Sequence, residues 1–361
     1  MVDTLSNDTF ATDRTLSESS IENLSNSHSS IESGNIEDIL HGSAILAGGG
    51  GGNYESALDL YMSLDPDPVE VRDLDEFVEN SNLATVFGLG TVDHVTDNHL
   101  EVARRSVELY ESEYEKIDGL ILGELGPDLV VEAALIADEL DIPLVNADVA
   151  GMRAVPSIQN EIIENSDISR TPVVATNGEK YRYIETGTGE ELEQEIRTLT
   201  DGEIWYVTGY TESPENYSEA AVEGWFEETL TFEDAEIGQI GSGELESVEF
   251  DEVDGHTSGR MTVNGESLIE AFLQNENLLA YRNGEQVASA PETITVIDEY
   301  GQAVYNGDLP EEGEQLEVYT IRYDFWQDSE ALNLQQLDLM TENESVRFQD
   351  QLELEIEGER Q

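Results

Sequence analysis

The chain has no cysteine among its 361 residues, and its 15 lysines and arginines face 81 aspartates and glutamates. The lack of cysteine excludes disulfides, thiolate metal sites and a cysteine nucleophile. Lys116 and Lys180 are the only lysines. A chain without basic patches cannot neutralise phosphates, which excludes nucleic acid as a partner.

Long apolar runs are also missing. No stretch approaches the roughly 20 apolar residues that span a bilayer, so we expect no membrane partner. The first residues contain neither a basic region nor an apolar core of the secretion-signal type. A cytoplasmic location is therefore expected.

The acidic residues give a net charge of −66 and are spread over every segment. Such a surface is typical of a protein adapted to multimolar salt, where screening acts over about 3 Å. Docking onto basic partners is the alternative, although a binding tail would form one acidic block. With 38% hydrophobic residues the chain can build a core, and its length suggests two domains or one large domain with an appendage.

Strand and helix patterns alternate between residues 69 and 150. The expected strands are 69–72, 84–87, 119–122 and 142–146, and the expected helices are 100–117 and 129–140. This order predicts a layered α/β/α domain with a mostly parallel sheet, which binds ligands at the carboxyl ends of its strands.

The second half has a different character. Residues 171–240 are mixed, with strands at 173–175 and 204–208 and a helix at 219–229. Residues 241–325 contain short strand patterns separated by dipeptides typical of tight hairpins, namely Asp254-Gly255, Asn264-Gly265, Asn283-Gly284 and Asn306-Gly307. They predict a β-rich, barrel-like domain. The expected organisation is a disordered tail at 1–34, an α/β domain at 35–170 and a C-terminal domain at 171–361 that ends in a polar tail at 327–361.

Five glycines stand between two expected helices: Gly48, Gly49, Gly50, Gly51 and Gly52. We refer to them as the glycine run. A backbone without side chains can approach a ligand closely, and its N–H groups can stabilise negative charge beside the start of the next helix. The alternative is a flexible connector.

Two acids follow expected parallel strands, Glu124 after 119–122 and Asp148 after 142–146. Either could serve as a general base, and the alternative is a carboxylate that caps the next helix. Asp128 has the position of such a cap, which leaves Glu124 available for chemistry.

The tetrapeptide Gln274-Asn275-Glu276-Asn277 interrupts an apolar strand pattern. It is either a bulge or loop exposed to water, which we favour on the pattern alone, or a polar cluster that faces a ligand. His94 and His99 could act as ligands or bases, and the alternative is two histidines without a chemical role. No spacing specific for zinc is present.

Four ordered segments resemble the S-methyl thiohydantoin desulfurase family, whose members often accompany hydantoinase/oxoprolinase proteins. They are 42–52, with the glycine run; 122–126, with Glu124; 146–156, with Asp148 and Arg153; and 274–278 followed by Ala288 and the 291–298 strand. The resemblance covers roughly residues 36–320 and departs from the family pattern at Asn53 and Ser157, where carboxylates are usual.

The resemblance implies an N-terminal α/β domain, a C-terminal β-rich domain, and hydrolysis of a C–S bond on a five-membered ring that releases a thiol. Glu124, Asp148 and Glu276 would be the catalytic acids. The glycine run, Arg153, Asn275 and Asn277 would bind the substrate, a small cyclic amide or thioamide. A divalent metal held by His94 and Asp148 is an optional cofactor.

Three functions stay open from the sequence. The first is the hydrolase, acting alone, as a homo-oligomer or beside a hydantoinase-type protein. The second is an inactive relative that binds small cyclic amides or partners a hydantoinase. The third is a structural acidic protein, which would leave the glycine run without a purpose.

Overall fold

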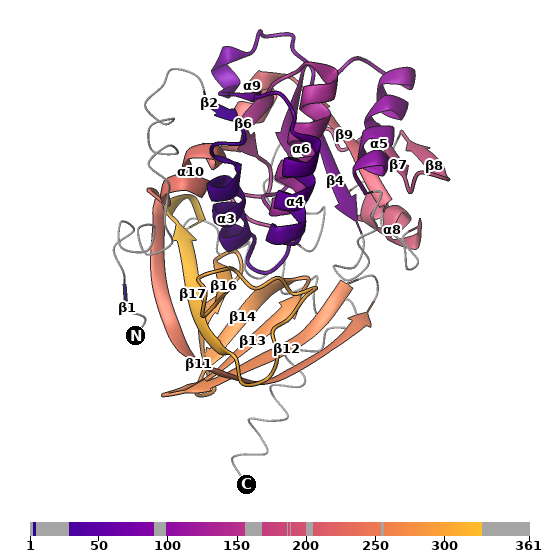
Figure 1. Cartoon of the computed structure of the whole chain (residues 1–361). Helices are drawn as coiled ribbons and strands as arrows, with labels where there is room; N and C mark the ends of the chain where they lie inside the picture. Colours follow the sequence, from indigo (N-terminus) through magenta and orange to yellow (C-terminus); the bar gives the residue numbers. More distant parts are fainter. Residues whose placement is uncertain are drawn as a thin grey trace.

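The computed structural model of the protein describes residues 3–4, 29–89, 99–155, 168–185, 187, 189–199, 205–253 and 256–326. These residues form an α/β domain with one sheet and a second domain built around another sheet (Figure 1).

The first sheet is mixed. Four parallel strands form its centre in the order β3 (Val69–Arg72), β6 (Leu144–Asp148), β5 (Gly119–Leu122) and β4 (Leu83–Leu89). Antiparallel strands flank them: β2 (Ser29–Ile31) beside β3, β9 (Trp205–Glu212), β7 (Val173–Thr176) and β8 (Tyr181–Ile184) beyond β4, and the short β10 (Val222–Glu223) on β6.

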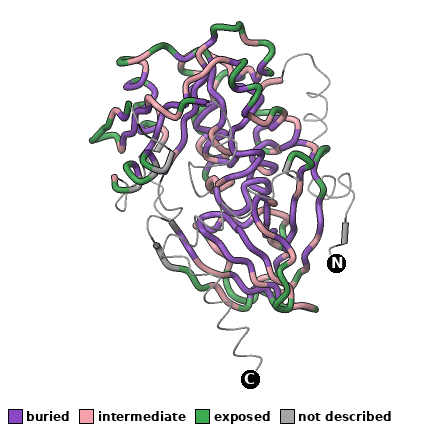
Figure 2. The backbone as a smooth tube through the Cα atoms, turned by 180° about the vertical axis from the view of Figure 1, so that it is seen from behind, coloured by how far each residue is buried: buried purple, intermediate pink, exposed green. Residues whose placement is uncertain are grey.

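Helices cover both faces of this sheet. One layer contains α3 (Ile36–Ala47), α4 (Tyr54–Leu64), α5 (His99–Glu113) and α6 (Pro127–Leu140), whose apolar residues share a core with the strands. The opposite core includes residues of α8 (Gly189–Leu199), α9 (Pro214–Ser218) and the 3-10 helix η1 (Leu74–Glu76). Helix α10 (Trp225–Thr231) packs on α3. Buried residues are concentrated in the middle of the molecule (Figure 2).

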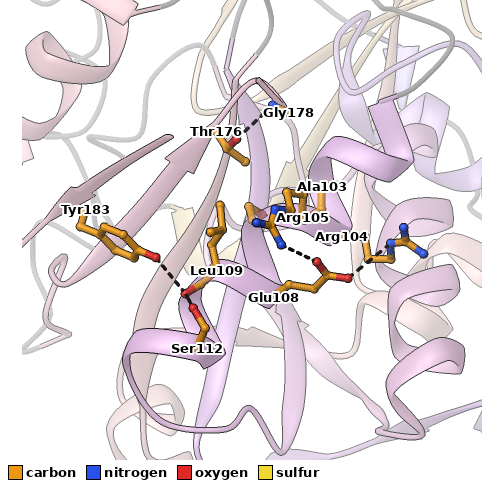
Figure 3. A network of polar contacts seen from close by, with 10 residues as sticks. Ala103, Arg104, Arg105, Glu108, Leu109, Ser112, Thr176, Gly178 and Tyr183 are labelled. Carbon is orange, nitrogen blue, oxygen red and sulfur yellow. Dashed lines mark hydrogen bonds and ion pairs between the residues drawn. The ribbon is translucent and has the colours of Figure 1, made fainter. Parts of the chain in front are cut away.

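Helix α5 illustrates how the few basic side chains are used. Glu108 pairs with Arg105 at 2.8 Å and with Arg104 at 4.0 Å, both on the exposed side of the helix (Figure 3). On another side, the Tyr183 hydroxyl of β8 donates to the Leu109 carbonyl at 3.5 Å. Exposed ion pairs of this kind stabilise a helix only weakly, so packing holds α5 in place.

The second sheet is entirely antiparallel. Its order is β15 (Glu285–Ser289), β14 (Glu276–Arg282), β13 (Leu268–Gln274), β12 (His256–Gly265), β11 (Ala235–Val253), β17 (Gln315–Tyr323) and β16 (Thr293–Asp298), with β1 (Asp3–Thr4) added to β11. The long β11 contains two register shifts, which increase its twist. The sheet curls until β14 contacts β16, and it encloses its own core. A short 3-10 helix, η2 (Asp324–Trp326), follows β17.

The expected fold class, α/β followed by a β-rich, barrel-like domain, is confirmed. The expected division at residue 171 does not follow the sheets, because β7, β8, β9 and β10 all belong to the first one. Residues 29–31 form β2, so the expected tail at 1–34 is too long at its end. The rest of that tail beyond Asp3–Thr4, and the tail at 327–361, lie outside the described residues.

Three local predictions need correction or cannot be followed. The helix expected at 219–229 is replaced by β10 and α10, because Gly224 in the left-handed region separates them. Asn306-Gly307 does not form a tight hairpin turn, because it lies within the long connection between the paired strands β16 and β17. Asp254-Gly255 lies outside the described residues. None of the helices in the described ranges is long and apolar enough to cross a membrane.

Candidate active site

The glycine run is an ordered loop with a defined conformation. Gly48 ends α3 in the left-handed region, with φ of 63°, and its N–H donates to the Ile45 carbonyl. Gly49, Gly51 and Gly52 also have positive φ, at 95°, 68° and 103°. The backbone at these four positions favours glycine on conformational grounds. The flexible-connector alternative is therefore wrong.

Residues of the β-rich domain hold one end of the glycine run. The Asn277 N–H donates to the Gly48 carbonyl at 2.8 Å, and the Asn306 N–H donates to the Gly49 carbonyl at 2.8 Å. Gly48 also lies against Ile294 of β16. The run thus connects the two domains, at the place in Figure 1 where α3 and α4 face the curled sheet.

The space left by the missing side chains is filled largely by the protein itself. A Cβ at Gly50 would overlap the Glu276 carboxylate, and a Cβ at Gly52 would overlap the Asp128 carboxyl group. A Cβ at Gly51 would lie 2.6 Å from the Cα of Gly126. The absence of side chains in the glycine run therefore allows the Gly126 backbone and two acidic side chains, one from each domain, to pack directly against it.

The tetrapeptide 274–277 is a buried tight turn between β13 and β14. Asn275 occupies the left-handed region with φ of 59°, and Gln274 pairs with Glu276 across the turn. All four residues are buried, so the favoured alternative of a water-exposed bulge or loop is wrong. The Asn275 side chain accepts from the Thr257 N–H at 2.9 Å, and its own N–H donates to the Thr257 carbonyl at 2.7 Å.

Asn306 completes this polar group, and sequence reasoning missed it because Asn-Gly resembles a hairpin turn. Its Nδ2 donates to the Asn275 carbonyl at 2.7 Å and to Asn277 Oδ1 at 3.2 Å. The side chain is 1% exposed. The Asn277 Nδ2 donates in turn to the Ile294 carbonyl at 3.1 Å. Three amide side chains from two loops thus form the support behind Gly48 and Gly49.

Asp128 is a second residue that sequence reasoning placed incorrectly. The helix begins at Pro127 with Gly126 as its N-cap, so Asp128 is the second helical residue and does not cap it. Its N–H donates to the Gly51 carbonyl at 3.0 Å, and its carboxyl group lies against Gly52. Burial raises the pKa of Asp128 to about 7.

One helical turn further on α6, Glu132 is buried at 2% exposure. The Tyr206 hydroxyl of β9 donates to Glu132 Oε1 at 2.5 Å. Burial, followed by the nearby Asp128 charge, raises the pKa of Glu132 well above its ordinary value. The signal in the sequence was a pair of acids four residues apart in the apolar first part of the helix, a spacing that puts both on one face.

Glu124 lies beside the loop that follows β6. Its Oε2 accepts from the Val155 N–H at 2.9 Å, and the neighbouring Leu125 N–H donates to the Arg153 carbonyl at 3.0 Å. The Leu125 carbonyl is close to Gly51. Arg153 is buried, and its Nε donates to the Ala150 carbonyl at 3.2 Å. Ser157 lies outside the described residues.

Asp148 is fully buried at the end of β6. Its two carboxylate oxygens accept from the N–H groups of Ala150 at 2.8 Å and Met152 at 2.9 Å. Burial raises its pKa to about 6, while these backbone donors act in the opposite direction. Asp148 thus orders the loop that carries Arg153, and this loop contacts Glu124 and Leu125, which precede the Gly126 backbone that lies against the glycine run.

The expected metal site finds no support in the described donors. Across the described ranges, no three His, Asp or Glu side chains gather in a way that could hold a metal ion. Both oxygens of Asp148 already accept backbone N–H groups. His94, the other expected ligand, lies outside the described residues.

A cavity of about 240 Å³ opens beside the glycine run. Gly49, Gly50 and Gly52 line it on one side, followed by Asn53 and Tyr54 at the start of α4. Residues 302–305 and 308–310 of the β16–β17 connection line it on the other side, including Tyr305. The cavity therefore lies between the two domains, with the backbone of the glycine run in its wall.

Comparison with known protein families gives two matches in chain order. Residues 34–186 match the S-Me-THD-like N-terminal domain, and residues 215–336 match the S-Me-THD-like C-terminal domain. The chain belongs to the S-Me-THD-like family. The resemblance inferred from the four sequence segments is thereby confirmed.

A crystal structure of a protein from Chromobacterium violaceum is similar to this S-Me-THD-like protein. The two share 21% identity and a TM-score of 0.67, over 85% of this chain and 95% of the other. At this identity the likeness shows a common fold. No curated protein matches the sequence.

Proposed function

We propose that this S-Me-THD-like protein hydrolyses the C–S bond of an S-methyl thiohydantoin-type ring. The observation that carries the proposal is that the glycine run forms part of the wall of an interdomain cavity. The Asp128 carboxyl group and the buried turn with Glu276 both lie against this same run. The match to the S-Me-THD-like family supports the choice of ring.

Asp128 is the general base in this proposal. A base that works near neutral pH needs a pKa near the working pH, and burial brings the pKa of Asp128 to about 7. The carboxylate removes a proton from water as the water oxygen adds to the ring carbon that carries the sulfur. The C–S bond then breaks and the sulfur takes the proton from Asp128, so methanethiol leaves. The remaining proton of the added water passes to the ring nitrogen, and the ring carbon keeps the oxygen as a carbonyl.

The glycine run would stabilise the negative charge that develops on the ring. Gly49, Gly51 and Gly52 have no backbone acceptor for their N–H groups within the described part of the chain. Preorganised N–H donors of this kind stabilise a developing anion without reorganisation. Glu276, Asn275 and Asn277 position the run and, through it, the ring.

Two of the acids expected to be catalytic have a structural role in this proposal. Glu124 and Asp148 accept N–H groups of residues 150–155, so in this proposal they shape the wall that holds Arg153. Because the described donors do not assemble a metal site, no step of the proposal uses a metal.

The test is release of methanethiol from an S-methyl thiohydantoin, measured with a thiol reagent in molar KCl. We expect turnover by the parent protein and a loss of about 10²- to 10⁴-fold in kcat for Asp128→Asn. Glu139→Gln, an exposed acid on the same helix, is the matched control and should keep the parent rate. Ring binding without thiol release by the parent would instead support the inactive binding protein.

A further inference from the structure

Asn53 stands where the glycine run meets α4, and it lines the interdomain cavity. It is the N-cap of α4: its Oδ1 accepts from the Ser56 N–H at 3.0 Å. Because Asn53 Oδ1 accepts the capping hydrogen bond, the orientation of the side-chain amide is fixed, and its Nδ2 is left to donate to a ligand. Among the described residues no acceptor binds this Nδ2.

Among the described residues, the rest of the cavity wall contains no basic side chain. Glu55, Asp298, Asp308 and Glu314 contribute acids, and Tyr54 and Tyr305 contribute phenol groups. The Oδ1 of Asp298 already accepts hydrogen bonds from the Tyr300 and Gln302 N–H groups of its own loop. A ligand that carries a negative charge would meet no countercharge here. The uncharged Nδ2 of Asn53 is suited to a neutral acceptor such as a ring carbonyl.

We propose that Asn53 determines specificity by donating from Nδ2 to a carbonyl oxygen of a neutral ring. This rests on the proposed function and names the residue that would bind the carbonyl of its ring. A carboxylate at position 53 would cap α4 equally well but would present only acceptors to the cavity. It would favour a ring with N–H donors and a positive charge.

The experiment measures binding, so it does not depend on turnover. Calorimetry in molar KCl compares hydantoin with 2-aminoimidazoline, a cyclic guanidine that is cationic at neutral pH, for the parent, Asn53→Asp and Asn53→Ser. Both substitutions keep an oxygen for the N-cap, and only the first adds charge. Asn264→Asp, at an exposed position near the end of β12, adds the same charge away from the cavity.

We expect both Asn53 variants to bind hydantoin at least 10-fold more weakly than the parent. Asn53→Asp alone should shift the preference toward the cationic ring by at least 10-fold, and Asn264→Asp should match the parent. Unchanged hydantoin affinity in both Asn53 variants would overturn the inference. If the parent binds hydantoin but releases no thiol, the hydrolase proposal fails and the role of Asn53 stands. If the parent binds neither ring, both fail.

Discussion

Substitution of Gly51 by alanine tests whether close backbone contact between the glycine run and α6 holds the site together. Gly51 has φ of 68°, and an added Cβ would lie 2.6 Å from the Gly126 Cα and 3.2 Å from both the Leu125 carbonyl and the Ala47 Cβ. The first contact is with backbone at the start of a helix, so it cannot be relieved by turning a side chain.

The magnitude follows from two separate costs. The left-handed backbone conformation costs an alanine about 1–2 kcal/mol relative to glycine. Overpacking against the fixed Gly126 backbone adds about 1–3 kcal/mol. Gly51→Ala should therefore lower the free energy of unfolding by about 2–5 kcal/mol.

Gly284→Ala is the matched control. Gly284 has φ of 78° in the β14–β15 turn, and no atom lies within 4 Å of the position that a Cβ would occupy there. It incurs only the conformational cost of about 1–2 kcal/mol. Urea unfolding in molar KCl, followed by the fluorescence of the buried Trp205 and Trp225, measures both variants. Equal losses in the two variants would refute the argument that the Gly51–Gly126 approach matters.

Three further outcomes are expected. If ionised Asp128 is the base, kcat should rise with pH through a pKa of about 7, and a flat profile would exclude that role. Burial raises the pKa of Glu228 from 4.5 to about 7, so the stability that its protonated form contributes below pH 4.5 is lost as the pH rises through 7. In the parent protein the free energy of unfolding should therefore fall between pH 5 and pH 8. Urea unfolding should show that Glu228→Gln makes this fall smaller, by up to about 3 kcal/mol. Asn306→Ala should cost about 2–4 kcal/mol in the same assay because it leaves two buried acceptors of the 274–277 turn unpaired, whereas the exposed Asn264→Ala should cost less than about 1 kcal/mol.

Local patterns predicted the elements well where periodicity was strong. The expected strands 69–72 and 119–122 coincide with β3 and β5, and the helix expected at 129–140 differs from α6 only at its start. That small difference had a consequence for the site. With Pro127 as the first helical residue, Asp128 is inside the helix, where its side chain turns toward Gly52 instead of capping.

The candidate site was predicted in part. The glycine run and the 274–277 turn do lie together, as the family resemblance implied. Asn306 and Glu132 were missed for different reasons. An Asn-Gly pair has the same local signature in a hairpin and in a long connection, and an acid inside an apolar helix shows its burial only when the facing strand is known.

By itself, the sequence determined the acidic surface, the absence of thiol chemistry, the succession of an α/β and a β-rich domain, and the family. These depend on composition, local periodicity and ordered motifs, which a chain carries before it folds. Only the tertiary structure decided which acids meet the glycine run, which amides stand behind it, and where the cavity opens. Those features depend on contacts between residues more than 70 positions apart, such as Gly51 with Asp128 and Gly49 with Asn306, and no local pattern encodes such distances.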